Sequence, residues 1–319
     1  MQISIAMCTY NGAHYLEEQL ASIVSQTRRP DELIICDDCS TDSTRSILTD
    51  FVATSPVKVT LKTNATRLGS TRNFEQAITL CSGDIIVLSD QDDVWLPEKL
   101  KLFEEAFSVD PEVALVFSDA ELIDHDGKSL NRTLWDTLSV EAEKLARPDA
   151  YEVLDRREAI TGTTMAFRSS FRSLVLPIPD NIPLIHDGWI AQMIAHAGNF
   201  KPISKPLIKY RQHSAQQVGA REQRIETNSN IVRSARRQTD FDQELRRTET
   251  VVKRMDACAG IFKFKGRDNV EAIVKHFKTR NSLTGQKFSS LPKIFRELLS
   301  GRYHRYSKGF SSFVKDLLT

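Results

Sequence analysis

The stretch IIVLSDQDDVWLP, residues 85–97, joins an apolar run to three carboxylates within four positions. An uninterrupted apolar run is typical of a strand that is covered on both faces of a sheet. In an extended segment Asp90 and Asp92 point to the same side, while Asp93 points to the other. Because like charges held that close repel one another, the pattern favours a bound cation, and ligands that are all oxygen favour Mg²⁺ or Mn²⁺ over zinc. A solvated turn, with an aspartate at the start of the next helix, is the alternative.

Short runs of strand character also precede this stretch, and segments with helical spacing separate them. Strands are predicted at residues 3–7, 33–36, 57–61 and 85–88. The apolar residues with helical spacing between them are Leu16, Leu20, Ile23 and Val24, then Ile47 and Leu48, then Phe74, Ala77 and Ile78. This alternation predicts an α/β fold with a parallel, doubly wound sheet.

Polar residues stand where three of the predicted strands end. They are Thr9-Tyr10-Asn11, Asp37-Asp38 and Asp90-Gln91-Asp92. Ligands of doubly wound sheets bind beyond the carboxyl ends of the strands, so these residues are expected to face one crevice. A carboxylate there can accept a hydrogen bond from a base N–H group or a ribose hydroxyl. For Asp37 and Asp38, a loop that caps the next helix through Ser40 or Asp42 is the alternative.

The rest of the chain predicts a less regular series of elements. Helices are expected at residues 98–107, at 150–157 and from Asp187 onward, with strands at 113–118, 163–167 and 207–210. The last of these strands runs into the loop Arg211-Gln212-His213. From about residue 221 the sequence is polar, basic and helix-like.

The composition of the 319 residues, 40% hydrophobic and 27% charged, allows a sizeable core in one large or two modest domains. The five cysteines are odd in number and irregularly spaced, which favours a reducing compartment over a disulfide framework. The N-terminus carries no basic residue before its apolar run, and no stretch reaches the roughly 18 apolar residues of a membrane-spanning helix. A cytoplasmic protein is therefore expected.

The charge is divided unevenly between the two parts of the chain. Of the 43 Lys and Arg and 42 Asp and Glu residues, residues 221–319 hold 22 and 11, which leaves 21 and 31 for residues 1–220. This asymmetry predicts a domain of residues 1–220 and a basic helical region of residues 221–319.

Six motifs follow one another in the sequence. They are ISIAMCTYNGAHYLEEQLASIVSQT (3–27), ELIICDDCSTDST (32–44), Gly69 with Arg72-Asn73, SGDIIVLSDQDDVWLPEKL (82–100), HDGWIAQMIAHAG (186–198) and YRQHSAQQVG (210–219). In this order the motifs resemble the inverting glycosyltransferases of family 2, which have the GT-A fold, a Rossmann-like, mostly parallel sheet flanked by helices. The last two resemble the bacterial rhamnosyltransferase-like branch that builds O-antigen and capsule. The resemblance covers roughly residues 1–220.

The resemblance implies a nucleotide-diphosphate sugar as donor, such as dTDP-rhamnose or a UDP-hexose, and a glycan or lipid-linked acceptor. It implies a Mn²⁺ or Mg²⁺ ion with Asp92 as the direct ligand, Asp90 in support and His213 near the metal or the diphosphate. It also implies that Asp187 is the general base. The residues implied to hold the nucleotide sugar are Thr9, Tyr10, Asn11, Asp37, Asp38, Arg67, Asp90 and Gln91.

Several of these residues have purely structural alternatives. Asp187 precedes a helix-like segment and is also expected to cap it. Tyr10 could be a packing aromatic residue, and His213 a loop or core histidine. His186 adjoins Asp187 and could orient it, while Trp189 could either pack in the core or line the acceptor site.

Basic and apolar residues interleave in residues 287–315, which favours a helix on an anionic membrane surface, on the inner face of the plasma membrane. The alternative is a helical appendage that packs on the catalytic domain. Nucleic acid is not expected as a partner, because the acidic residues 1–220 would repel phosphates.

Three other functions compete with glycosyl transfer. A sugar nucleotidyltransferase would also place carboxylates and metal at strand ends, but residues 8–12 lack its Gly-rich loop and its lysine. A domain that binds a nucleotide sugar or glycan without turnover would need neither the D-x-D motif nor Asp187. A phosphatase of the D-x-D-x-T type is disfavoured because Val94 stands where the threonine should be.

Overall fold

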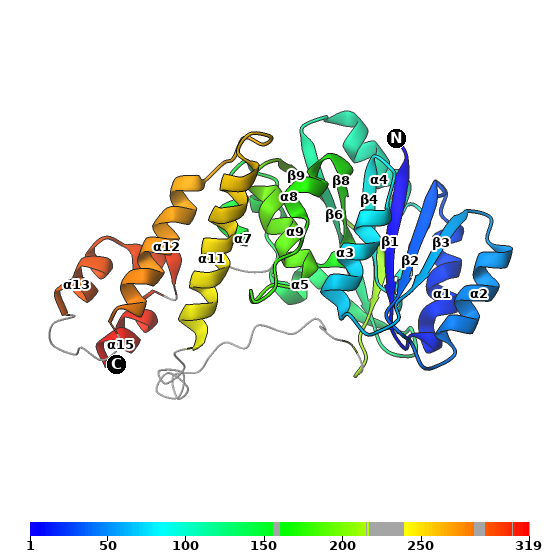
Figure 1. The fold of residues 1–319 in the computed structure, drawn as a ribbon, viewed down its shortest axis with the longest axis horizontal. Helices are drawn as coiled ribbons and strands as arrows, with labels where there is room; N and C mark the ends of the chain where they lie inside the picture. Colours follow the sequence, from blue (N-terminus) through cyan, green and yellow to red (C-terminus); the bar gives the residue numbers. More distant parts are fainter. Residues whose placement is uncertain (156–159, 215, 217–238, 284–290, 308, 319) are drawn as a thin grey trace.

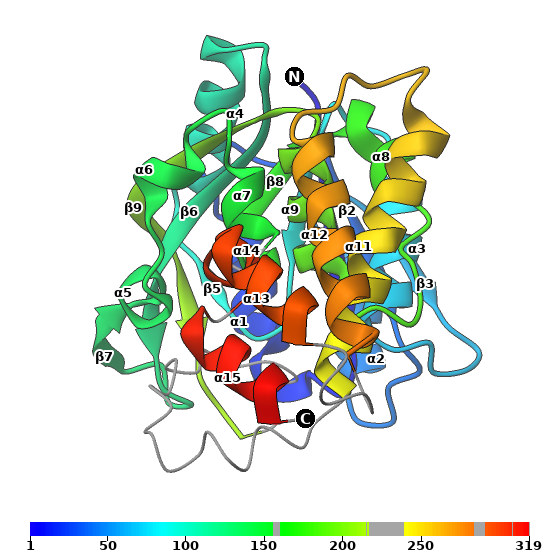
Figure 2. The same cartoon turned by 90° about the vertical axis from the view of Figure 1, so that its left-hand side faces the viewer.

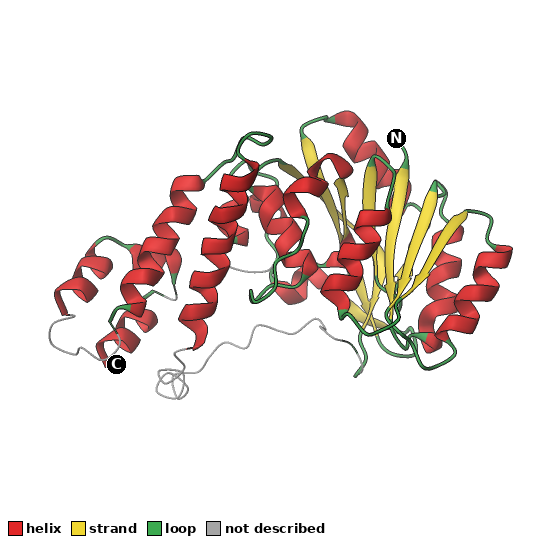
Figure 3. Ribbon diagram, viewed as in Figure 1, coloured by secondary structure: helices red, strands yellow, loops and turns green. Residues whose placement is uncertain are grey.

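The computed structural model describes residues 1–155, 160–214, 216, 239–283, 291–307 and 309–318. A central sheet carries helices on both faces, and a further group of helices lies at the end of the molecule away from α1 and α2 (Figures 1 and 3). The α/β fold with a C-terminal helical extension is therefore the one that the sequence predicts.

The first half of the sheet consists of parallel strands joined by helices. Its strands are β1 (Ile3–Thr9), β2 (Glu32–Asp37), β3 (Lys58–Thr63) and β4 (Ile85–Ser89), in the order β3-β2-β1-β4. The connecting helices are α1 (Ala13–Val24), α2 (Thr44–Thr54) and α3 (Ser70–Leu80). Every residue of β1, β2 and β4 is buried, as uninterrupted apolar runs predict for strands covered on both faces.

The second half of the sheet is mixed. It contains β5 (Val94–Trp95), β6 (Val113–Ile123), β7 (Ser129–Thr133), β8 (Met165–Arg168) and β9 (Asn199–Arg211). Strand β8 lies antiparallel between β4 and β6, β9 pairs parallel with β6, and β5 and β7 pair antiparallel with β9 and β6. The first four strands are thus all parallel, whereas in the second half of the sheet only β6 and β9 pair in parallel.

Three predicted strands differ clearly from those observed. Strand β6, predicted at residues 113–118, extends to Ile123. Strand β8 begins at Met165 rather than at residue 163, because Gly162–Thr164 forms a 3₁₀ turn, η1. Strand β9 is longer than the predicted residues 207–210, and its register with β6 shifts near Pro206. Prolines donate no ladder hydrogen bond, so Pro202 and Pro206 hide the start of this strand in the sequence.

Helices and 3₁₀ turns complete this part of the chain. They are α4 (Lys99–Val109), α5 (Leu134–Leu138), α6 (Ala142–Leu145), α7 (Tyr151–Leu154), η2 (Ser169–Phe171), α8 (Arg172–Val175) and α9 (His186–Ala195). The helix predicted at residues 150–157 corresponds to α7, and residues 156 and 157 of that prediction lie outside the described residues.

Hydrophobic cores lie on both faces of the sheet. Leu16 of α1 and Leu100 of α4 pack in one core, and Phe74 of α3 and Trp189 of α9 pack in the other. The Trp189 indole is fully buried, and its Nε1 donates to the Val175 carbonyl at 2.8 Å. The expectation that Trp189 could line the acceptor site is therefore wrong, because the ring is a core residue.

The described part of the C-terminal region, from residue 239 onward, is helical, as its sequence predicts, and residues 221–238 of the prediction lie outside the described residues. Its helices are α11 (Thr239–Cys258), α12 (Arg267–Asn281), α13 (Leu291–Leu299), α14 (Arg302–Tyr306) and α15 (Phe310–Leu318). Val251 and Met255 of α11 belong to the same core as Trp189, so α11 packs against the sheet-bearing part of the chain. No helix within the described residues is long and apolar enough to cross a membrane.

A buried polar cluster ties these helices together. The Asp155 carboxylate accepts hydrogen bonds from Gln192 of α9 at 2.8 Å and Asn269 of α12 at 3.2 Å, and it lies 2.9 Å from Nε2 of His196. The other ring nitrogen of His196 lies 3.0 Å from the Lys265 carbonyl. Because buried polar groups must be paired, this cluster fixes α12 against α9.

Candidate active site

A cavity of about 1310 Å³ opens at the carboxyl ends of β1 and β4. The start of α9 and the end of β9 close its other side. The predicted site residues that line it are Thr9, Tyr10, Asn11, Asp38, Arg67, Asp90, Gln91, Asp92, Asp187 and His213. Residues that are far apart in the sequence thus meet in one place, as the strand ends predict.

Asp90, Asp92 and Asp93, the acidic triplet, lie in the bend between β4 and β5 and divide between the cavity and the interior. Asp90 and Asp92 line the cavity, whereas Asp93 is fully buried and its Oδ1 accepts from the Arg211 N–H at 3.2 Å. Burial, and then the charges of Asp92 and Asp93, raises the pKa of the Asp90 carboxyl well above its ordinary value. Burial and the charge of Asp92 raise the pKa of Asp93 to about 7. A cation between the cavity-facing carboxylates would relieve this repulsion.

His213 lies beside the acidic triplet. Its Nε2 is 2.8 Å from Oδ2 of Asp92, a residue 121 positions away in the chain. Neighbouring ligands of an octahedral cation with bonds of about 2.1 Å lie roughly 3 Å apart. The spacing and donor types of Asp92 and His213 are compatible with two ligands of a divalent cation, and the same 2.8 Å is the length of a direct hydrogen bond between them.

Gln91 holds Tyr10 beside the acidic triplet. Its Oε1 accepts from the Tyr10 N–H at 2.8 Å, and its Nε2 donates to the Tyr10 carbonyl at 3.0 Å. A Cβ at Gly12 would lie 2.2 Å from the same Oε1, so a side chain at that position would displace the Gln91 amide. The Arg67 guanidinium lies 3.9 Å from the centre of the Tyr10 ring, in cation–π contact. The Gln91 amide thus positions Tyr10, which is itself a part of the cavity wall.

Asp38 combines a structural role with a place in the cavity. Its Oδ1 accepts from the Leu68 N–H at 2.7 Å and from the Asn64 amide at 3.0 Å, and its Oδ2 accepts from the Gly69 N–H at 2.8 Å. These bonds fold the loop between β3 and α3 over the end of β2.

Asp37 departs from the expectation that it faces a nucleotide. It is fully buried, and its carboxylate accepts from the Thr9 hydroxyl at 3.0 Å and pairs with Arg45 at 3.2 Å. It does not line the cavity. The reason is that β2 extends through Asp37, so consecutive side chains point to opposite faces and only Asp38 is turned to the cavity. Asp37 instead supports Thr9.

Asp187 lies at the cavity wall in the first turn of α9. Its Oδ2 accepts from the Gly162 N–H at 2.9 Å, and its Oδ1 accepts from the Gly188 N–H at 2.7 Å. The N-cap residue is Ile185, which makes no side-chain cap. A carboxylate in the first turn also interacts favourably with the helix dipole, so Asp187 combines a helix-end role with a place in the cavity.

His186 does not orient its neighbour Asp187 through a hydrogen bond. The imidazole is buried and stacks on the Phe74 ring with centroids 3.9 Å apart, and burial lowers its pKa. Neither ring nitrogen finds a hydrogen-bond partner among the described residues.

Arg211 is a site residue that the sequence did not single out. Its buried guanidinium donates to the Asp92 carbonyl at 2.8 Å and the His125 carbonyl at 3.2 Å, and it pairs with Glu18 at 2.6 Å. It also lies over the Tyr15 ring, 4.6 Å from its centre. The backbone of the acidic triplet is thus held in place from β9.

Lys99 is a second such residue, and it is fully buried. Its Nζ donates to the Thr163 carbonyl at 2.6 Å and lies 3.7 Å from the centre of the Trp95 indole. Burial lowers the pKa of this ammonium group well below its ordinary value, although nearby carboxylates oppose the shift. Thr163 is next to Gly162, whose N–H group donates to Asp187. Lys99 therefore connects the helix that follows the acidic triplet to the turn that holds Asp187.

If Asp187 is the general base of a sugar transfer, as the family resemblance implies, replacing Lys99 by methionine is expected to lower kcat by about 10²-fold while leaving donor affinity almost unchanged. The reason is that a shift of about 1 Å in the turn would misplace Asp187. Steady-state kinetics and donor titration measure the two quantities separately. The matched control is Lys101→Met, at an exposed position on the same helix. A Lys99→Met protein with the wild-type kcat would show that the bond to Thr163 plays no part in placing Asp187.

Comparison with known proteins was made on both sequence and structure. The profile of the family described as "Glycosyl transferase family 2" matches residues 4–174. An uncharacterized glycosyltransferase of Nostoc sp. is 30% identical over 219 residues, which cover 67% of this chain and 66% of the relative. The dTDP-rhamnosyl transferase RfbG of Shigella flexneri is 28% identical over 230 residues, which cover 67% of this chain and 74% of the relative.

Two further proteins extend the comparison. A UDP-Glc:α-D-GlcNAc-diphosphoundecaprenol β-1,3-glucosyltransferase of Escherichia coli, WfgD, is 29% identical over 124 residues, or 39% of this chain and 47% of the relative. Among solved structures, S. aureus TarS 1–349 in complex with UDP-GlcNAc superposes with a TM-score of 0.58 at 14% identity, covering 99% of this chain and 90% of that one. This last likeness concerns the fold.

Proposed function

The chain belongs to glycosyl transferase family 2, and from that premise we propose that it transfers a sugar from a nucleotide-diphosphate sugar to a hydroxyl group, with inversion at the anomeric carbon. The family and the GT-A fold, both expected from the motifs, are confirmed by the profile match and by the likeness to TarS. The observation that carries the proposal is a single cavity with the pair Asp92 and His213 on one wall and Asp187 on another.

The donor is proposed to bind at the carboxyl end of β1. Tyr10, with Arg67 stacked on it, offers a flat surface for a base, and Thr9 and Asp38 lie beside it on the cavity wall. We propose dTDP-rhamnose or a UDP-hexose as the donor. RfbG is a dTDP-rhamnosyl transferase, and WfgD is a glucosyltransferase that uses UDP-Glc.

Asp92, Asp90 and His213 are proposed to hold a Mn²⁺ or Mg²⁺ ion. Such an ion supplies positive charge against the negative charge that develops on the diphosphate leaving group. The protein residues contribute the fixed ligand geometry, and Arg211 keeps the Asp92 backbone in place.

Asp187 is proposed to accept the proton of the acceptor hydroxyl as the oxygen attacks the anomeric carbon. The bond from the sugar to the diphosphate breaks on the opposite face, so one displacement inverts the configuration. The Gly162 and Gly188 N–H groups leave the carboxylate oriented toward the cavity.

The acceptor is proposed to be a glycan or a lipid-linked sugar in the synthesis of a cell-surface polysaccharide such as O-antigen or capsule. The wall near Asp187 includes the apolar side chains of Leu138, Ile160 and Ile185, which suit an acceptor with an apolar part. A lipid-linked acceptor would bring the enzyme to the inner face of the plasma membrane through its basic region.

A panel of nucleotide sugars tests the donor assignment. UDP-, dTDP- and GDP-sugars are each added with Mn²⁺, Mg²⁺ or EDTA, and the unfolding temperature is recorded. One class of nucleotide is expected to raise the Tm by several degrees in a metal-dependent manner, because a ligand at about 100 times its Kd adds about 2.7 kcal/mol of stability. Folded protein that responds to none of the donors would contradict the proposal and favour a domain that does not use nucleotide sugars.

A further inference from the structure

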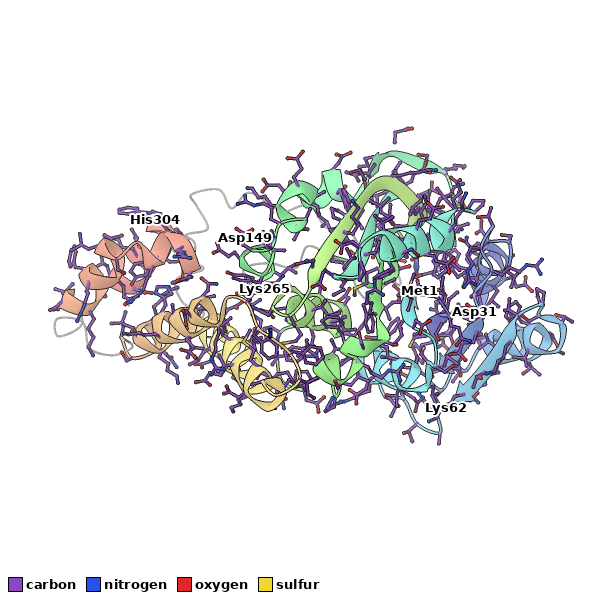
Figure 4. The ribbon with its side chains drawn as sticks, turned by 90° about the horizontal axis from the view of Figure 1, so that it is seen from above. Met1, Asp31, Lys62, Asp149, Lys265 and His304 are labelled. Atoms are coloured by element: carbon purple, nitrogen blue, oxygen red, sulfur yellow. The ribbon has the colours of Figure 1, made fainter. Side chains whose placement is uncertain are left out.

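The last three helices form a small unit at the end of the molecule away from α1 and α2. In Figure 2 α13, α14 and α15 face the viewer, and in Figure 4 His304 of α14 lies at the end opposite to Asp31 and Lys62. Ile294, Tyr303 and Phe313 are buried in a core of their own. The sequence predicts a single interfacial helix here, whereas Ile294 and Tyr303, two of its apolar residues, face this core.

Other apolar side chains of the same helices point outward. Phe295 is 48% exposed, Leu299 86% and Phe310 62%. The rings of Phe295 and Phe310 lie 5.7 and 5.4 Å from the ring of Phe313, so they flank the same residue. Leu299 lies one helical turn after Phe295, on the same face of α13. Phe295, Leu299 and Phe310 therefore form one exposed apolar surface, the Phe295 patch.

The acidic and basic residues of this unit differ in number and in burial. Residues 291–319 contain six Lys and Arg residues, and their acidic residues are Glu297 and Asp316. Both acids are buried: Glu297 lies 2.7 Å from the His276 ring, and Asp316 pairs with Arg280 at 2.7 Å. Both acids are thus engaged inside the unit. Glu297 also pairs with Arg302 at 2.7 Å and Arg305 pairs with Glu152 at 3.4 Å, and the exposed cations of α13 are Lys293 and Arg296.

Lys293 and Arg296 of α13 are exposed. Arg296 lies three residues before Leu299 and three after Lys293, so the two cations follow one another along the helix face that borders the patch at Leu299. An exposed apolar surface bordered by cations matches the interface of an anionic lipid bilayer, where aromatic and aliphatic side chains enter the headgroup region and cations meet the phosphates. A second copy of the chain fits less well, because the same positive surfaces would face each other.

We propose that the Phe295 patch, with Lys293 and Arg296 beside it, is a docking surface for anionic membrane lipid. The surface is separate from the cavity residues, so the proposal does not depend on the identity of the donor. It assigns membrane contact to the outward faces of α13 and α15, and the inward faces hold the small core.

Vesicle sedimentation with the full chain tests the proposal. Phosphatidylcholine vesicles with and without phosphatidylglycerol are compared at low and high salt. The protein is expected to sediment with the anionic vesicles and to be released by salt. The variants Leu299→Ser with Phe310→Ser, and Lys293→Glu with Arg296→Glu, should each raise the lipid concentration for half-maximal binding by about tenfold or more. The matched controls are Ile261→Ser and Lys253→Glu, at exposed positions outside α13–α15.

Three results would overturn the proposal. One is wild-type protein that does not bind anionic vesicles. Another is undiminished binding by the Leu299→Ser, Phe310→Ser variant with an unchanged Tm. The third is a dimer in light scattering that this variant converts to a monomer, since the patch would then join two copies of the chain.

Discussion

Replacing Asp92 by alanine is expected to abolish metal-dependent donor binding and to lower turnover on the order of 10³-fold or more. The substitution removes the carboxylate that lies 2.8 Å from His213, so one ligand nitrogen would remain without its partner. Folding should be preserved, because the charge of Asp92 contributes to the repulsion that raises the pKa values of Asp90 and Asp93. Donor-induced changes of Tm, with Mn²⁺ and with EDTA, measure the binding directly.

The control for this experiment is Asp50→Ala, an exposed aspartate on α2 outside the cavity. It should behave as the wild type in both assays. If the Asp92→Ala protein still showed a metal-dependent shift of normal size, the metal would be held elsewhere, and the assignment of Asp92 and His213 would be wrong.

Replacing Asp187 by asparagine is expected to lower kcat by about 10²- to 10⁴-fold and to leave donor binding intact. Asparagine has a similar shape, and its carbonyl oxygen can still accept from the Gly162 N–H, but it is too weak a base to take the acceptor proton. Kinetics under saturating donor, together with the donor-induced change of Tm, separate the two effects.

The matched control is Asp180→Asn, in the loop before α9, where the carboxylate is 66% exposed and pairs with Arg72. Loss of both turnover and donor binding in Asp187→Asn would assign the carboxylate to donor binding instead of to proton transfer. An unchanged kcat would remove it from the mechanism altogether.

The fold was predictable where the strands contain uninterrupted apolar runs. Strands β1, β2 and β4 are buried along their whole length because helices cover both faces of the sheet, and the apolar runs within them make this visible in the sequence. Strands β8 and β9 were placed less accurately. A 3₁₀ turn replaces the first residues of the predicted β8, and Pro202 and Pro206 interrupt the strand pattern of β9.

The candidate site was predictable to the extent that it lies at strand ends. The position of Asp90 and Asp92 follows from the end of β4, whereas the meeting of Asp92 with His213 over 121 residues depends on the fold and was implied only by the family resemblance. The side chain of Asp37 was expected to face the cavity because the predicted strand ended at Cys36. In the structure β2 extends to Asp37, which turns this side chain away from the cavity.

Arg211 and Lys99 were missed for a different reason. A single basic residue has no periodicity, and the sequence does not show that its charge is buried. Both side chains are nevertheless fixed by hydrogen bonds to backbone carbonyls, Arg211 to Asp92 and Lys99 to Thr163. Such contacts become visible only when the fold brings the segments together.

The stereochemistry of donor hydrolysis tests the central claim most directly. The donor that gives the largest thermal shift is incubated with the enzyme and Mn²⁺ without acceptor, so that water takes the place of the acceptor hydroxyl. Proton NMR then identifies the anomer of the released sugar before it equilibrates. With Asp187 as base and the diphosphate leaving from the opposite face, the first anomer formed should be inverted relative to the donor, and Asp187→Asn should form it far more slowly. Release of the retained anomer would contradict the single displacement and the role proposed for Asp187.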